Sequence, residues 1–400
     1  MKKHTETTIQ QKQSGAVSIT KQLIQIDSSD PGAYEGEIGQ WIRQALCSHH
    51  IPVTTKEVLP GRFNIMGEIK GECDSPALVY ICHMDTVTLG SGWTHPPLSA
   101  FEQDGRIYGR GACDMKSGLA CALSAFLTAA AQAQAADSRP RHTFRFLATV
   151  DEEDFMRGVE DAIRSGWVRK DDWILDTEPT NGQIQVAHKG RTWFELNVKG
   201  VTAHASTPWK GADAIASMAE MIVSIREQID ACPTHCELGK STVTFGQIQG
   251  GYRPYVVPDD CTVCIDMRLV PPTDTPAAAT IVETAIARGE HAVPGTRGSY
   301  VITGDRPYVE RDGNSFLLKE LALAHKKITA AEAAVTYFPG YTDTAVIAGT
   351  LHNHNCMSYG PGDLELAHKP DESVPIEDIL RCEQVLTELA RQILFPSADN

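Results

Sequence analysis

Three apolar runs in the first half of the chain each end in histidine or acidic residues, and this pattern constrains the fold most. The runs are PALVYICHMD (76–85), HTFRFLATV (142–150) and DDWILDTEPT (171–180). Continuous apolar runs of this length are typical of parallel strands buried on both faces. Between the first two lies the alanine-rich stretch 115–136, expected to be a helix with Asp114 as its N-cap. Strands alternating with helices predict an α/β fold with a mostly parallel sheet.

The pattern changes near residue 190. RTWFELNVKG (191–200) alternates apolar and polar residues like a half-buried strand, and ADAIASMAEMIVSIREQI (212–229) has the spacing of an amphipathic helix. Two further strands, a second helix and a last strand follow before about residue 306. Two helices on a four-stranded sheet form a small α+β domain of the ferredoxin-like kind. We therefore expect a large domain of residues 1–189 and 307–400, with residues 190–306 inserted into it.

Composition excludes several classes of protein. The formal net charge is −15, which argues against nucleic acid as a partner because phosphate binding needs a basic surface. No apolar run reaches the length expected of a membrane span, and the first residues, MKKHTETTIQQKQSG, are too polar for a signal peptide. The 11 cysteines form no regular framework and are expected to be reduced thiols. We expect a cytoplasmic protein with no membrane partner.

The polar residues that follow the strands suggest a metal site. In open α/β sheets ligands bind outside the carboxyl ends of the strands, so three strand ends would deliver their side chains to one edge. Each residue alone has a structural explanation: a core histidine, a helix N-cap or a solvated acidic turn. Together two imidazoles and three carboxylates suit zinc, manganese or cobalt. These candidate ligands are His83, Asp114, Glu153, Glu178 and His368.

Five motifs in a fixed order resemble those of a known enzyme family. They are HMDTV, GRGACDMKSG, VDEED, DTEPT and AHKPDESV, spread from about residue 75 to 375. Their order is similar to that in the metallopeptidase family of acetylornithine deacetylase, succinyl-diaminopimelate desuccinylase, aminoacylase and carboxypeptidase G. The resemblance implies a catalytic domain with an inserted lid and dimerisation domain, and thus a homodimer.

The resemblance also implies how the ligands are shared between two divalent ions, with zinc expected and cobalt or manganese as alternatives. His83 and Glu178 would hold one ion, and Glu153 and His368 the other. Asp114 would bridge the two.

Catalytic roles follow from the same resemblance. Glu152 would be the general base and later the proton donor, and Asp85 would orient His83 through its carboxylate. His204, in GVTAHASTPWKGADAI, would stabilise the oxyanion in the partner subunit's site. Arg268 would help to hold a substrate carboxylate, and Gly360 would lie in a loop beside the substrate.

One position departs from the family pattern. The lid motif GG-x-x-x-Asn-x-x-Pro has Tyr255 in place of the asparagine, in GGYRPYVVPDD. A phenol cannot reproduce the paired donor and acceptor of a carboxamide, which puts the usual acyl amino acid substrate in doubt.

Three functions are therefore open. The first is hydrolysis of the amide bond of a small carboxylate-bearing substrate, such as an N-acyl amino acid or dipeptide. The second is hydrolytic deamination, or another amidohydrolase reaction, of an aromatic or cyclic amine-bearing compound, which Tyr255 motivates. The third is a binding protein without catalysis, against which every expected ligand and the base are present.

Overall fold

The computed structural model describes residues 15–396, which divide into two compact units. The first unit contains the chain up to residue 186 together with residues 312–336 and from 342 onward, and the second contains residues 187–311 and 337–341. These boundaries lie a few residues from the expected ones. The short segment 337–341 was not expected in the second unit, where the Tyr341 hydroxyl donates to the Pro307 carbonyl at 2.9 Å.

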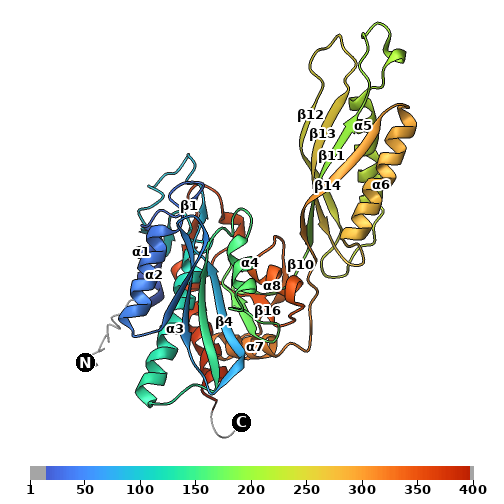
Figure 1. Cartoon of the computed structure of the whole chain (residues 1–400). Coiled ribbons are helices and arrows are strands. Elements are labelled where there is room, and N and C mark those ends of the chain that lie inside the picture. Colours follow the sequence, from blue (N-terminus) through green and yellow to red (C-terminus); the bar gives the residue numbers. More distant parts are fainter. Residues whose placement is uncertain (1–14, 397–400) are drawn as a thin grey trace, which may run out of the picture. The chain divides into compact units, whose positions relative to one another are not determined.

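An eight-stranded sheet forms the centre of the first unit (Figure 1). Its order is β15 (Val335–Phe338), β10 (Ile184–His188), β16 (Cys356–Ser358), β9 (Trp173–Asp176), β4 (Cys73–His83), β8 (His142–Thr149), β3 (Arg62–Ile69) and β2 (Val53–Leu59). The four strands from β16 to β8 are parallel to one another. The pairs β10–β16, β3–β8 and β2–β3 are antiparallel. The expected parallel sheet therefore describes the centre, and antiparallel strands extend it on both sides.

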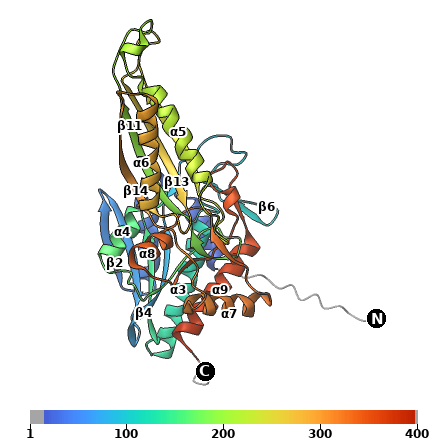
Figure 2. The same ribbon diagram turned by 90° about the vertical axis from the view of Figure 1, so that its right-hand side faces the viewer.

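Helices cover both faces of this sheet, as Figures 1 and 2 show. One face carries α1 (Gly15–Ile24), α2 (Gly36–Ser48), α3 (Lys116–Ala136), α7 (Phe316–Thr329) and α9 (Ile376–Leu394). The shorter α4 (Arg157–Arg164) and α8 (Asp343–Leu351) pack together on the other face. Smaller elements are β1 (Ser29–Asp30) with β5 (Thr86–Val87), and β6 (Phe101–Gln103), β7 (Arg106–Tyr108) and β17 (Ser373–Pro375), with a 3-10 turn, η2 (Leu364–Leu366).

The sequence expectation that no segment reaches membrane-spanning length was wrong for α3, which is long and apolar enough by length and composition. In the fold this helix packs between α1 and α9 against the central sheet. Buried apolar residues of this helix, such as Leu119, Leu123 and Phe126, belong to the main hydrophobic core. Burial in that core explains its apolar sequence.

The second unit is a four-stranded antiparallel sheet with two helices on one face. Its elements follow in the order β11 (Gly190–Lys199), α5 (Ala214–Asp230), β12 (Thr242–Gly250), β13 (Asp260–Leu269), α6 (Thr275–Ala292) and β14 (Arg297–Arg306), with a 3-10 turn, η1 (Pro208–Lys210), before α5. The strands lie in the order β12-β13-β11-β14, the ferredoxin-like arrangement expected from the sequence. Inward residues such as Phe194, Val263 and Met221 form a core of their own.

The parallel strands bring their carboxyl ends to one edge of the central sheet. β4 ends at His83, and its neighbour β8 is followed by Glu152 and Glu153. On the other side of β4, β9 is followed by Glu178. This edge is where the candidate site forms.

Candidate metal centre

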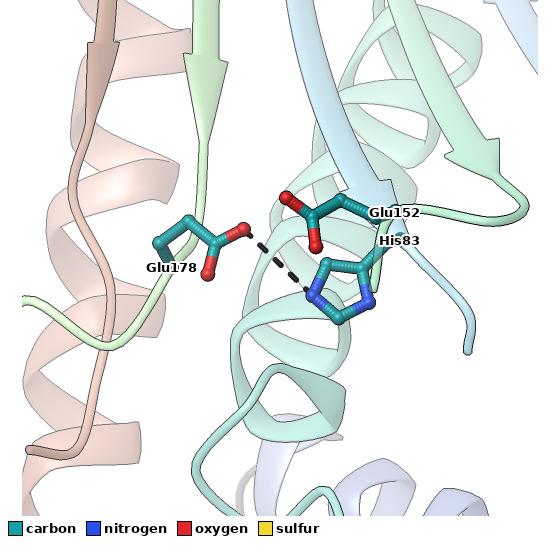
Figure 3. A group of neighbouring side chains, drawn as sticks. All are labelled: His83, Glu152 and Glu178. Carbon is teal, nitrogen blue, oxygen red and sulfur yellow. Dashed lines mark ion pairs between the residues drawn. The ribbon is translucent and has the colours of Figure 1, made fainter. Parts of the chain in front are cut away.

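His83 and three carboxylates form the more deeply buried half of the site. His83 Nε2 lies 3.2 Å from Asp114 Oδ1 and 3.7 Å from Glu178 Oε1. Figure 3 shows Glu152 beside His83 and Glu178, and ligand atoms of these three residues all lie within 4.8 Å of one another. All four side chains are buried.

His368 completes the other half. Its Nε2 lies 3.0 Å from Glu153 Oε2 and 3.4 Å from Asp114 Oδ2. Asp114 therefore directs one oxygen to each histidine, which is the position that a carboxylate shared by two metal ions would need. The structure brings the five candidate ligands and Glu152 together.

Burial and mutual repulsion raise the pKa values of the carboxyl groups nearest β4 and β9. Burial raises the pKa of Glu152 well above its ordinary value, and the negative charge of Asp114 raises it further. The pKa of Glu178 rises for the same two reasons. Glu152 is therefore held in a setting that favours its protonated form.

The pKa values of both histidines are also raised, whereas that of Asp114 is lowered. Burial alone would lower the pKa of His83, but its contact with Asp114 and the surrounding carboxylates raise that pKa well above normal. Asp114 and Glu153 raise the pKa of His368 to about 10. Burial would raise the pKa of Asp114, but its contacts with His368 and His83 outweigh that effect and lower it. Each imidazole is thus stabilised as a cation by the carboxylates that would otherwise repel one another.

The donor set fits divalent metal ions. Across residues 15–396, the recorded ion pairs of Asp114, Glu153 and Glu178 are with the two histidines and not with lysine or arginine. Several buried carboxylates held this close are unfavourable unless a cation neutralises them. Histidine nitrogens with carboxylate oxygens are ligands that zinc, manganese and cobalt accept.

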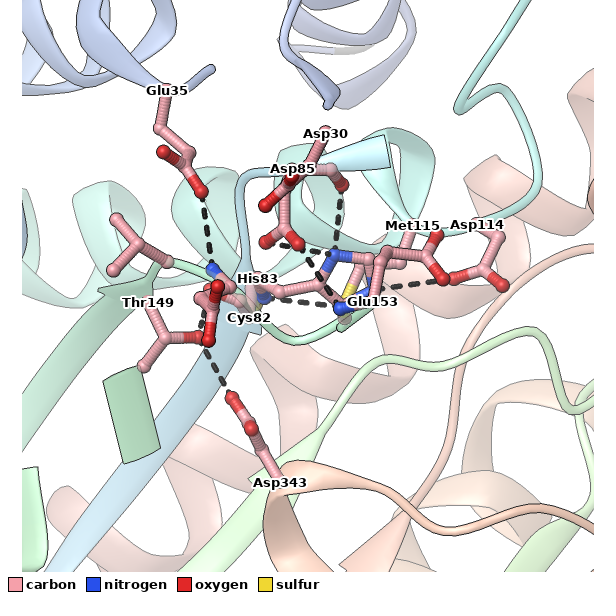
Figure 4. A network of polar contacts seen from close by, with 12 residues as sticks. Asp30, Glu35, Cys82, His83, Asp85, Asp114, Met115, Thr149, Glu153 and Asp343 are labelled. Carbon is pink, nitrogen blue, oxygen red and sulfur yellow. Dashed lines mark hydrogen bonds and ion pairs between the residues drawn. The ribbon is translucent and has the colours of Figure 1, made fainter. Parts of the chain in front are cut away.

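Asp85 contacts His83 through its backbone carbonyl, and not through its carboxylate as was expected from the sequence. The His83 Nδ1–H donates to the backbone carbonyl of Asp85 at 2.9 Å, whereas the Asp85 carboxylate Oδ1 lies 3.8 Å from that nitrogen. The carboxylate instead accepts a hydrogen bond from the Glu153 amide, at Oδ2 and 3.0 Å (Figure 4). The expected orientation of His83 is thus supplied by a carbonyl, and it leaves Nε2 directed at the carboxylates.

A buried ion network that was not expected from the sequence supports the loop of Glu152 and Glu153. Arg62 contacts the carboxylates of Asp30, Glu35 and Asp151. Glu35 also accepts a hydrogen bond from the Asp151 amide at 3.1 Å. Asp151 has a left-handed backbone, with φ of 68°, immediately before Glu152. The network therefore fixes the turn from which both glutamates project.

The expected N-cap role of Asp114 was wrong. α3 begins at Lys116 with Met115 at its N-cap position, and no side chain caps the helix. The carboxylate of Asp114 is engaged by the two histidines, so it is not available to the helix amides.

Two glycines allow the chain to pass close to the backbone that carries Glu178. A Cβ on Gly118 would lie 2.0 Å from the Thr177 carbonyl oxygen, and one on Gly360 would lie 2.3 Å from the same atom and 2.4 Å from the Glu178 carbonyl oxygen. The Thr180 hydroxyl accepts a hydrogen bond from the Gly360 amide at 3.0 Å. Close packing alone therefore explains why glycine stands at position 360, and its contact with substrate stays a prediction.

The remaining candidate residues lie in the second unit. His204 pairs with Val256, and the neighbouring Ala205 amide donates to the Tyr255 carbonyl at 3.0 Å, so His204 and Tyr255 line one open hollow. Arg268 forms two hydrogen bonds to Asp266, at 2.8 and 3.0 Å. The catalytic and substrate-binding roles of these residues stay predictions.

Comparisons with known proteins agree with this geometry. The family model described as peptidase family M20/M25/M40 matches residues 79–392. A probable succinyl-diaminopimelate desuccinylase of Staphylococcus aureus is 27% identical over 90% of this chain and 93% of its own length. The acetylornithine deacetylase of Myxococcus xanthus is 30% identical over 78% of each chain.

Solved structures share the fold. The aminopeptidase PepT of Bacillus cereus superposes with a TM-score of 0.76 at 21% identity, covering 95% of this chain and 98% of that one. A Bacillus subtilis protein described as a dinuclear metal binding peptidase superposes with a TM-score of 0.68 at 18% identity, covering 96% and 98%. Since the family model spans most of the sequence, this chain belongs to peptidase family M20/M25/M40.

Proposed function

We propose that this enzyme hydrolyses the amide bond of a small carboxylate-bearing substrate, such as an N-acyl amino acid or a dipeptide, with metal ions and a glutamate general base. The observation that carries the proposal is the position of Glu152 beside His83 and Glu178 at the carboxyl edge of the sheet. The named relatives, a desuccinylase and a deacetylase, support the same substrate class.

Two divalent ions would be held by residues already facing one another. His83 and Glu178 would hold the first, Glu153 and His368 the second, and Asp114 both. Zinc suits this donor set, and cobalt or manganese would also be accepted. Bound here, such ions would lower the pKa of a water molecule and polarise the substrate carbonyl.

Glu152 would move the protons. Its buried carboxyl group has a raised pKa, which suits a group that takes a proton from water and then gives it to the leaving nitrogen. No recorded ion pair engages this carboxylate within residues 15–396, whereas the proposed ligands are paired with histidines. Glu152 would therefore accept a proton without giving up a partner.

The second unit would supply substrate contacts. His204 would stabilise, in the partner subunit's site, the negative charge that develops on the carbonyl oxygen, and Arg268 would help to hold the substrate carboxylate. Tyr255 would contact the rest of the substrate, and Gly360, which belongs to the first unit, would lie in a loop beside it. We further propose that the enzyme works in the cytoplasm as a homodimer on a small-molecule substrate, with no nucleic-acid or membrane partner. Among residues 15–396, β12 and β14 are the edge strands of the smaller sheet, and an edge strand can pair with a second copy of the chain.

A second function is favoured by the loop of residues 252–255. Tyr252 and Tyr255 are 61% and 58% exposed, and both line the hollow that contains His204. Exposed phenol rings can stack on a planar substrate as well as donate hydrogen bonds. The alternative is therefore hydrolytic deamination, or another amidohydrolase reaction, of an aromatic or cyclic amine on the same metal site.

One substrate panel separates these functions. The purified enzyme is stripped with a chelator, reloaded with zinc, cobalt or manganese, and assayed on N-acyl amino acids, dipeptides and aryl amines. Metal-dependent release of an acyl group or amino acid supports the first function, and ammonia release from an aryl amine supports the second. Metal binding with neither product overturns both.

A further inference from the structure

Glu372 joins the two loops that carry Asp114 and His368. Its buried carboxylate lies four residues after His368, and Oε1 accepts hydrogen bonds from the amides of Cys113 and Asp114 at 2.8 and 3.0 Å. Oε2 accepts from Nη1 of Arg110 at 2.6 Å. The Glu372 carbonyl also accepts from the Gly109 amide at 2.9 Å. One residue of the His368 loop is thus bonded to both ends of the segment that leads to Asp114.

Arg110 extends this connection to a third segment. Its Nε donates to the Thr88 carbonyl at 3.2 Å, its Nη2 to the Leu89 carbonyl at 3.4 Å, and its Nη1 also reaches the Lys369 carbonyl at 3.4 Å. The Arg110 and Glu372 side chains are only 3% and 1% exposed. A buried ion pair whose hydrogen bonds are this well satisfied specifies one geometry, and loss of one partner leaves the other charge buried and unpaired.

His368 is carried by a loop and not by a strand end. His368 lies between η2 and β17, outside any regular element, and it has a left-handed φ of 62°. Its side chain is 49% exposed, whereas that of Asp114 is 8% exposed. His83 and Glu178, in contrast, are held at the ends of neighbouring strands of the central sheet. Of the two proposed metal positions, the one at His368 therefore depends more on loop contacts.

We propose that Glu372, paired with Arg110, is a positioning residue that fixes the separation of Asp114 and His368 and so sets the affinity for the second metal ion. This inference rests on the two-ion site of the proposed function. Glu372 acts through the Asp114 amide and through its own loop, and it would not ligate either ion. The ion at His83 and Glu178 should be much less sensitive to it.

The test is a two-step titration of the chelated, full-length protein with Zn²⁺, followed by calorimetry and repeated with Co²⁺ for its absorption spectrum. His83→Ala and His368→Ala identify which binding step belongs to which ion. His368→Ala should abolish one of the two binding steps. In Glu372→Ala the metal affinity of that same step is expected to fall by about ten- to a hundred-fold, the range for residues that support metal ligands. The other step should change by less than about three-fold. Glu372→Gln should have a smaller effect, because its amide oxygen can still accept from Cys113 and Asp114.

Arg145→Met is the matched control. The buried Arg145 pairs with Glu68, between β8 and β3, and with the buried Asp172, and its ion pairs involve no proposed ligand. This variant should lower the melting temperature while leaving both metal affinities as in the wild type. If Glu372→Ala does not fold, Arg110→Lys provides the test, because it keeps the charge and loses the several directed hydrogen bonds.

The outcomes separate this inference from the proposed function. If folded Glu372→Ala binds both ions with wild-type affinity, the inference is overturned and the proposed function is unaffected. Selective loss of the second ion in a protein that hydrolyses no amide supports the inference and overturns the function. A wild-type protein that binds fewer than two ions contradicts both.

Discussion

The Asp85 carboxylate accepts a hydrogen bond from the backbone amide of Glu153, at 3.0 Å. This bond connects the end of β4 to the loop after β8, so that one residue serves both halves of the metal centre. Its carbonyl orients His83 and its carboxylate holds the loop of Glu152 and Glu153.

Replacing Asp85 by alanine should therefore affect the Glu153 side of the centre more than the His83 side. The carbonyl that accepts from His83 remains in Asp85→Ala, whereas the acceptor for the Glu153 amide is lost. We expect kcat to fall by about ten- to a hundred-fold, with weaker binding of the second ion. Asp85→Asn keeps an acceptor oxygen, so its kcat and its affinity for the second ion should lie between those of Asp85→Ala and the wild type. Kinetics with metal analysis checks this, and selective loss of the ion at His83 would contradict it.

Arg62 should contribute strongly to stability. Arg62→Met would leave the buried carboxylates of Asp30, Glu35 and Asp151 without their shared cation. Breaking a buried ion network in this way costs about 3–5 kcal/mol. The control is Lys326→Met, because the Lys326–Glu332 pair is largely exposed and such pairs contribute about 0–1 kcal/mol. Urea unfolding measures both, and equal effects of the two variants would refute the role given to Arg62.

Gly360 should tolerate no side chain. In Gly360→Ala the new Cβ would meet two backbone carbonyl oxygens, which cannot move without displacing Glu178. We expect a loss of stability of at least about 1–3 kcal/mol, the usual cost of overpacking, together with weaker metal binding. Gly36, the first residue of α2, has nothing within 4 Å of an added Cβ, so Gly36→Ala should be neutral or slightly stabilising. An alanine at 360 with wild-type stability and metal content would disprove this packing argument.

His188 should make stability depend on pH. Burial lowers the pKa of this imidazole to about 4, below its ordinary value near 6.5. The folded state thus favours the neutral ring, so this contribution is fully present above about pH 6.5 and is lost as the pH falls towards 4. His188→Phe, which suits the adjacent rings of Phe338 and Tyr341, should flatten the decline of melting temperature over that range. A decline as steep as in the wild type would rule out His188 as its cause.

The sequence predicted the parts of the site that follow from local pattern. His83, Glu152 and Glu178 were identifiable because each comes at or just after an apolar strand, and parallel neighbours must bring such ends together. The ferredoxin-like order of the second unit followed from two helices among four alternating strands. Both inferences need only periodicity and the chirality of connections.

What the sequence did not reveal depends on contacts between distant segments. Arg62 precedes Asp151 by 89 residues, and Arg110 precedes Glu372 by 262, so nothing local marks either pair. Asp114 stands just before a helix and resembles an N-cap, and only the folded chain brings the two histidines that engage it instead. For Asp85 the sequence could not distinguish a contact made by its carbonyl from one made by its carboxylate.

Glu152→Gln tests the central claim most directly, with turnover of the best substrate and metal content measured on the same preparation. The account predicts two ions per chain, as in the wild type, because Glu152 is not a proposed ligand. It also predicts a loss of kcat of about a hundred- to ten-thousand-fold, the usual contribution of a general base. Wild-type turnover in this variant, or loss of metal in step with activity, would contradict the role of Glu152 as the proton carrier.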